Sequence, residues 1–231
     1  GYSRAWVRLA DRPERNRNRS VLFLRNGGHE STAVGIVSGA PVTPQLREDQ
    51  NMAPPTHRVA TPEELEIALD DVRRSPTDIG EAELLLRRPG VSQREVIDFA
   101  EFDTAIGLLG DNWFVRGSTS QPDGLADPDK QLTIMNSRAA NAVAFTRDRW
   151  AFAGDQIYAD LDISVENLPT GTRLRFGTAV FEVTESPHLG CAKFTQRFGL
   201  NAMRWVNSEE GKRLRLRGVN VRVVEGGSAH L

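Results

Sequence analysis

The sequence predicts a mainly β protein, a barrel or sandwich of short strands with a few short peripheral helices. Short runs of alternating or β-branched residues recur from about residue 80 onward, and glycine and proline turn signals separate them. Few stretches have a helical period, and these are short. Hydrophobic residues make up 39% of the 231 residues and charged residues 26%, which is ordinary for a soluble globular protein.

The first 58 residues are expected to form a poorly ordered or peripheral arm. Residues 12–19 read RPERNRNR, with neither a helical nor a strand period, and residues 26–55 are rich in glycine and proline. No aromatic residue interleaves with these arginines, and the formal net charge is −2, so we expect no nucleic-acid partner. The apolar runs fall far short of the roughly 20 residues that a membrane helix needs, so we expect no membrane association.

Residues 59–78 are predicted to form a bracing helix. Thr61 suits the N-cap, Pro62 suits the first helical position, and Glu64 completes a capping box. Apolar residues then repeat at i, i+4 and i+7 and define one buried face, made of Leu65, Leu69 and Val72. Pro76 is expected to end the helix.

Residues 79–226 are expected to hold the β domain. A strand over 80–88 meets a Pro89-Gly90 turn signal, and residues 95–99 can return as its partner. A strand over 131–135 is followed by Ser137, which is expected to cap a short helix over 138–144. Residues 157–163 alternate with a period of two, which is typical of a half-buried strand.

The C-terminal third is predicted to contain a hairpin and a thiol-bearing loop. Residues 173–176 and 180–184 are strand-like runs on either side of a turn at Gly177. Residues 194–205 have partly helical character. Arginine alternates with leucine over 212–217, as in an edge strand, residues 218–224 are predicted to form the last strand, and residues 227–231 a loose tail.

Cys191 is the only cysteine. It excludes an intramolecular disulfide and any four-cysteine metal cluster, and it favours a reducing compartment such as the cytoplasm. Most lone cysteines are small buried hydrophobes, but three neighbours favour a working thiol here. Gly190 would let a backbone or a ligand approach closely, and His188 and Lys193 would place cations near a thiolate.

Several segments together resemble the MOSC domain, the domain named after the C-terminus of molybdenum cofactor sulfurases. The resemblance runs from about residue 80 to 224. It rests on residues 166–177 (ENLPTGTRLRFG), 181–184 (FEVT) and 191–193 (CAK), with weaker matches at 110–111, 131–134 and 154–156. The sequence departs from the family at 112–114, where a histidine often stands, and in the insert 117–130.

The resemblance implies a β-barrel and an oxidoreductase that binds the molybdenum cofactor (molybdopterin) and reduces N-hydroxylated compounds. It makes Cys191 the catalytic residue and the molybdenum ligand, since a thiolate is a soft ligand. The cofactor carries a phosphate and needs cations and polar groups around it. The candidate cofactor-binding residues are Lys193, Arg197, Asp111, His188, Gly190 and Asn136. Arg173 and Arg175 are weaker candidates, because strand alternation turns them outward.

The chain lacks iron–sulfur spacing and a dinucleotide-binding fingerprint, so the oxidoreductase would need an external electron-donor protein.

Two alternatives to the oxidoreductase stay open. In the first alternative the chain is a sulfur carrier that holds a persulfide on Cys191, without a tightly bound cofactor and supplied by a cysteine desulfurase. In the second it is a non-catalytic binding module. The substrate and the oligomeric state do not follow from the sequence.

Overall fold

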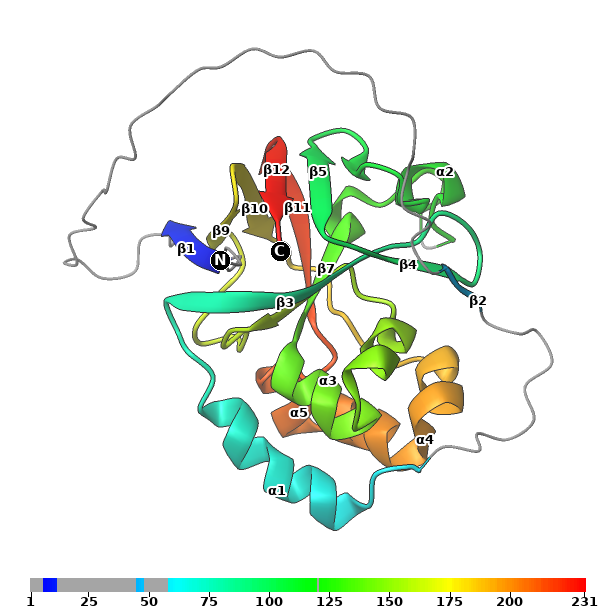
Figure 1. The fold of residues 1–231 in the computed structure, drawn as a ribbon, viewed down its shortest axis with the longest axis vertical. Helices are drawn as coiled ribbons and strands as arrows, with labels where there is room; N and C mark the ends of the chain where they lie inside the picture. The colour runs from blue at the N-terminus through cyan, green and yellow to red at the C-terminus, as the bar shows by residue number, and fades with distance from the viewer. Residues whose placement is uncertain (1–5, 12–44, 48–57, 120) are drawn as a thin grey trace.

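Seven strands close into a barrel in the computed structural model, which describes residues 6–11, 45–47, 58–119 and 121–231 (Figure 1). Adjacent strands are antiparallel, except for the parallel pair β7–β8, and pairing between β1 and β3 closes the ring. The fold class predicted from the sequence is therefore confirmed. In order around the barrel the strands are β1 (Trp6–Asp11), β9 (Arg173–Phe176), β10 (Ala179–Val183), β11 (Val219–Glu225), β7 (Leu132–Asn136), β8 (Ile157–Asp160) and β3 (Ile79–Arg87).

Further strands extend this ring at one edge. β4 (Gln93–Ile97) pairs with β3, and β2 (Gln45–Arg47) pairs with β4. A separate small sheet has the order β12 (Gly227–His230), β5 (Phe99–Asp103) and β6 (Gly107–Leu108).

Four helices gather on one side of the barrel, below the strands in Figure 1: α1 (Pro62–Arg73), α3 (Ser137–Ala144), α4 (Ala192–Asn207) and α5 (Glu209–Arg213). The short α2 (Trp113–Arg116) lies apart from them, beyond β4. The 3₁₀ turns η1 (Pro128–Lys130) and η2 (Arg147–Ala153) complete the elements. In the part of the chain that the structure covers, no helix combines the length and apolar character needed to cross a bilayer.

Strand alternation divides the buried side chains into two clusters. In β8, Ile157 and Ala159 point into the barrel, while Tyr158 points outward and packs under the helices. The barrel cluster is filled by residues such as Phe176 and Phe181, and the second cluster lies between the barrel wall and α1, α3 and α4. A strand covered on both faces explains why Tyr158 is fully buried although the sequence predicts a half-buried strand.

Short-range signals in the sequence predicted a helix start and a hairpin correctly and one N-cap wrongly. The capping box forms as expected: Glu64 N donates to Thr61 Oγ1 and Thr61 N donates to a Glu64 carboxylate oxygen. The hairpin of β9 and β10 turns at Gly177, whose φ of 58° favours glycine. The helix after 137 is present, but its N-cap is Asn136, whose side chain accepts from Ala139 N, so the expectation that Ser137 caps it is wrong.

Both ends of the chain differ from the prediction. Residues 6–11 are not peripheral: they form β1, in which Val7 is 0% exposed, and they pair with β9 and β3. The remainder of the expected arm, apart from β2 and residue 58, lies outside the described residues. Residues 227–230 are not a loose tail, because β12 pairs with β5 and buries Ala229.

The predicted edge strand over 212–217 is also wrong. Ser208 Oγ accepts from Gly211 N and starts α5, which occupies residues 209–213. The chain then turns through Arg215, whose φ is 51°, and buries Leu214, Leu216 and Arg217. The alternating Arg and Leu residues therefore form a partly buried turn, and Arg217 at its end lies in the protein interior.

Candidate functional site

A cavity of about 220 Å³ lies where the β3–β4 turn, α2 and the start of α4 meet. Cys191 is among its lining residues and is exposed. Six of the lining side chains are cationic: Arg88, Arg94, Arg116, Lys193, Arg197 and Arg217. No Asp or Glu is found among the lining residues that the structure describes. The cavity is therefore an anion-binding environment that contains the only thiol of the chain.

Local structure places Cys191 at the mouth of this cavity. It is the N-cap residue of α4, in an extended conformation with φ of −122° and ψ of 179°. Its carbonyl accepts from Thr195 N at 3.0 Å, which is the first bond of the helix. Lys193 and Arg197, four residues apart on the same helix, both line the cavity, so these two predicted residues do lie near the thiol.

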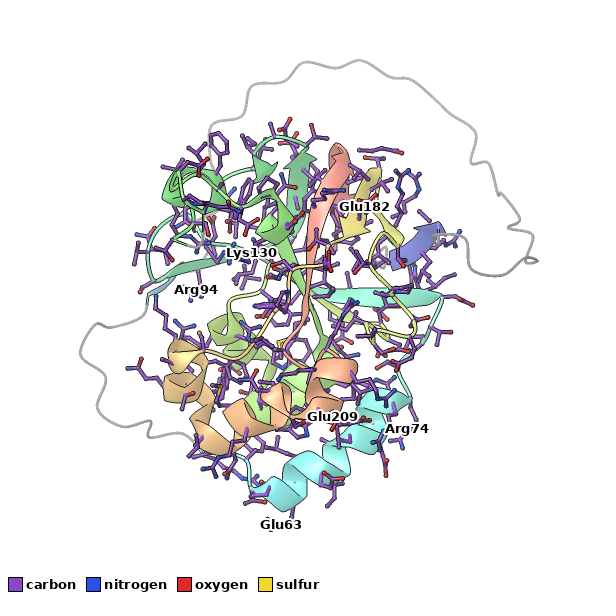
Figure 2. The ribbon with its side chains drawn as sticks, turned by 180° about the vertical axis from the view of Figure 1, so that it is seen from behind. Glu63, Arg74, Arg94, Lys130, Glu182 and Glu209 are labelled. Carbon is purple, nitrogen blue, oxygen red and sulfur yellow. The ribbon has the colours of Figure 1, made fainter. Side chains whose placement is uncertain are left out.

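The cationic side chains come from elements far apart in the sequence. Arg197 Nη1 donates to the carbonyl of Phe152 at 2.7 Å, and Arg94 Nε donates to that of Ala151 at 3.1 Å. Both contacts anchor α4 and β4 to η2. Figure 2 labels Arg94, which lies on β4 toward the helical layer. These carbonyl contacts fix the positions of both guanidinium groups at the cavity.

Arg217 and Asp155 form a buried ion pair beside the cavity. Arg217 Nη1 donates to Asp155 Oδ2 at 2.6 Å, Nη2 donates to the carbonyl of Ala153, and the guanidinium lies 5.0 Å from the ring centroid of Phe194. Asp155 is 0% exposed and the Arg217 side chain 8%. Such a pair is costly to desolvate, and loss of either partner would leave an uncompensated buried charge.

His188 lies against this pair but is not a cation. Its Nδ1 is 3.4 Å from Asp155 Oδ1, and its side chain is 18% exposed. Burial and the charge of Arg217 lower the pKa of His188 to about 3, so the imidazole is neutral at physiological pH. The expectation that His188 supplies positive charge to the thiolate is therefore wrong, although the residue does line the cavity.

Asp111 acts through Arg88 and does not line the cavity. Its carboxylate accepts from Arg88 Nε at 2.9 Å and Arg88 Nη2 at 3.0 Å, and from the backbone N–H groups of Arg88 and Trp113. This bidentate pair fixes the guanidinium of Arg88, which is a lining residue. Asp111 is thus a positioning residue for a cation that the sequence prediction missed.

Two predicted residues belong elsewhere. Asn136 is 1% exposed and structural: besides capping α3, its Nδ2 donates to Ser75 Oγ and to the carbonyl of Leu161. A Cβ at position 190 would lie 2.9 Å from Met203 Sδ and 2.9 Å from Val206 Cγ2. Gly190 therefore makes room for helix α4 and not for a ligand.

Arg173 and Arg175 point outward, as strand alternation predicts. Their side chains are 45% and 48% exposed, and they face Glu182 on the adjacent β10 and Glu225 on β11, the strand beyond it. The residues that the prediction missed are Arg88, Arg94, Arg116 and Arg217. A paired Arg-Gly at 217–218 and the Arg-Pro-Gly turn at 88–90 were the available signals, and neither identifies a site alone.

The side chains around the cavity match the chemical groups of the molybdenum cofactor. The thiol suits a metal ligand, and the cationic side chains suit a phosphate. Asn112 Oδ1, beside the cavity, is buried without a hydrogen-bond partner among the described residues, and this acceptor suits an N–H of a heterocycle. The residues present therefore fit the group.

Comparison with known proteins gives only remote similarities. The chain is similar to a solved structure of the YuaD protein from Bacillus subtilis, with 16% identity and a TM-score of 0.49, over 65% of this chain and 91% of that chain. It is also similar to YiiM from Escherichia coli, with 17% identity and a TM-score of 0.41, over 64% of this chain and 65% of that chain. No family model and no curated protein sequence matches the chain.

Proposed function

We propose that this protein is a MOSC-type oxidoreductase that binds the molybdenum cofactor and reduces N-hydroxylated compounds. The observation that carries the proposal is the position of Cys191 among six cationic side chains in one cavity. The sequence resemblance over 166–193 and the mainly β barrel support it. When bound, the cofactor would supply two-electron oxygen-atom transfer chemistry.

Each residue of the cavity has a role in the proposal. Cys191 is the metal ligand, and Lys193, Arg197 and Arg94 bind the phosphate of the cofactor. Asn112 accepts a hydrogen bond from the pterin through its Oδ1. His188 stays neutral and offers a hydrogen-bonding ring without adding to the charge.

The overall reaction sets the need for a partner. Reduction of an N-hydroxylated compound breaks the N–O bond, consumes two electrons and two protons, and releases water. With one cysteine the chain cannot hold an iron–sulfur cluster, so an external protein must supply the electrons.

The test is elemental analysis for molybdenum in the wild type and in Cys191→Ser, both purified from a host that makes the cofactor. We expect molybdenum in the wild type and a large loss in the variant, while Arg173→Gln, on the exposed β9 face, serves as a control that keeps its metal. A wild-type protein free of molybdenum would contradict the proposal.

A sulfur carrier is the second candidate, favoured by the exposure of Cys191, because a desulfurase must reach the thiol directly. Intact-mass measurement after incubation with a desulfurase and cysteine separates the two functions. The carrier function predicts a gain of one sulfur atom on Cys191 that a thiol reductant removes, and no bound pterin.

A further inference from the structure

The second half of helix α4 lies close to the loop that precedes the helix. The helix contains a kink at Gly199, where φ is 86° and ψ is 169°, and a Cβ at this position would collide with Val59. Because of the kink, residues 200–207 return toward residue 190. Met203 and Val206 then pack against Gly190, where a Cβ would lie 2.9 Å from each of their side chains.

Asn207, the last residue of α4, binds both backbone groups of Gly190. Gly190 N donates to Asn207 Oδ1 at 2.9 Å, and Asn207 Nδ2 donates to the carbonyl of Gly190 at 3.1 Å. The same Nδ2 lies 3.0 Å from Met203 Sδ, which fixes which end of the amide is the donor. The amide thus holds residue 190 as a neighbouring β-strand would.

We propose that Asn207 is a positioning residue that holds the thiol of Cys191 inside the cationic cavity. Cys191 directly follows Gly190 and is extended, so its position is set by residue 190 on one side and by the first turn of α4 on the other. If the Asn207 contact is lost, only the helical side remains, and the loop before it is free to leave the cavity. The inference rests on the proposed function for one premise, that Cys191 works within this cavity.

The test uses the fact that Cys191 is the only cysteine, so every alkylation event reports on it. The rates with anionic iodoacetate and with neutral iodoacetamide are measured at one pH and low salt. Their ratio reports the electrostatic field at the thiol, since the thiolate fraction is common to both reagents. In the wild type we expect the ratio to exceed that of a small free thiol by about tenfold, and to fall as salt is added.

Asn207→Leu keeps roughly the size of the side chain, adds no charge, and removes both hydrogen bonds to the backbone of Gly190. We expect the ratio to fall close to that of the free thiol, with the iodoacetamide rate still measurable. Asn201→Ala is the matched control: it lies on the same helix and loses one hydrogen bond, to the carbonyl of Ala60, far from the thiol loop. Its ratio should stay at the wild-type value.

A merely structural role would lower the melting temperature and leave the ratio unchanged, so an unchanged ratio in folded Asn207→Leu overturns the inference. If that variant does not fold, Gly190→Ala moves the same loop away from Met203 and Val206, and the same criterion applies. A wild-type ratio equal to that of the free thiol also overturns it. If the ratio behaves as expected but the protein lacks molybdenum, the positioning role stands and the proposed function fails.

Discussion

Arginines occur in two contrasting settings in this protein. On the outer face of the helical layer, Arg73 and Arg213 pair with Glu210, and Arg213 also reaches Glu166. Six cationic side chains line the cavity, and the carboxylates that pair with Arg88 and Arg217, Asp111 and Asp155, do not belong to the lining. The outer arginines contact carboxylates directly, whereas the described lining of the cavity contains six cationic side chains and no Asp or Glu.

The contrast is between exposed ion pairs at the surface and cationic side chains gathered in a cavity. Exposed ion pairs contribute little to folding, because water already solvates both partners. Cations gathered in a cavity repel one another and lose solvation, so an unliganded cavity is destabilising and an anion would relieve it. Four predictions test this contrast, from the largest expected effect to the smallest.

The largest effect is expected from Asp155→Asn, which removes the charge that faces Arg217 without changing the volume. The guanidinium then stays buried without a counter-ion, and we expect the free energy of unfolding to fall by about 3–5 kcal/mol. Denaturant unfolding measures this loss. The control is Glu166→Gln on the outer face, and a loss in Asp155→Asn no larger than in this control would contradict the contrast.

Asp111→Asn is expected to have the second largest effect. It weakens the bidentate hold on Arg88 and the bonds to two backbone N–H groups, which should cost about 2 kcal/mol. The variant should also gain less thermal stability from inorganic phosphate than the wild type does, because Arg88 is no longer fixed. An equal gain from phosphate would show that Arg88 takes no part in anion binding.

The two regions should respond to acid in different pH ranges. The pKa of His188 is about 6.5 in the unfolded chain and about 3 in the folded protein. Between these values only the unfolded chain binds the proton, so stability is complete above the upper value. It falls as the pH drops toward the lower value, by at most about 1.4 kcal/mol per pH unit.

In the outer network, Arg213 and Arg73 lower the pKa of Glu210 to about 2. Its contribution is therefore present above the unfolded pKa of about 4.5 and is lost only as the pH falls below that value. Unfolding measured across pH should show that His188→Gln removes the loss in the upper range and Glu210→Gln the loss in the lower range. An unchanged profile in His188→Gln would mean that the histidine is already charged in the folded protein.

The smallest effect is expected from Glu166→Gln, which breaks an exposed pair with Arg213. Because both side chains remain solvated, the denaturation midpoint should be indistinguishable from that of the wild type. A clear loss of stability would show that the outer network is cooperative, and would weaken the contrast with the cavity.

The elements that depend on short-range signals were predicted correctly from the sequence. The capping box at Thr61 and the hairpin around Gly177 depend on adjacent residues, and both form as expected. The strand β1 could not be recognised, because its six residues are ordered by partners in β9 and β3. Burial of Leu214 and Leu216 likewise overrode the strand-like alternation around them.

The same difference between short-range signals and long-range contacts applies to the site. Cys191, Lys193 and Arg197 belong to one segment, and the sequence placed them together correctly. Arg88 and Arg217 reach the cavity only through the folding of the barrel and the turn after α5, so no local spacing relates them to the thiol. The role of Asn207 depends on the kink at Gly199, which returns a distant residue to the loop.

The closing strand of the barrel also sets the order of events during synthesis. Val7 pairs with Phe176 in β9, and both partners of β1 lie far along the chain. As the protein emerges from the ribosome, β1 therefore has no complete binding groove until β9 has been made. Closure of the barrel is a late step, and such long-range pairing is slow. Once β9 has been made, and until β1 pairs with it, the unpaired edges of β3 and β9 are open to pairing with other chains.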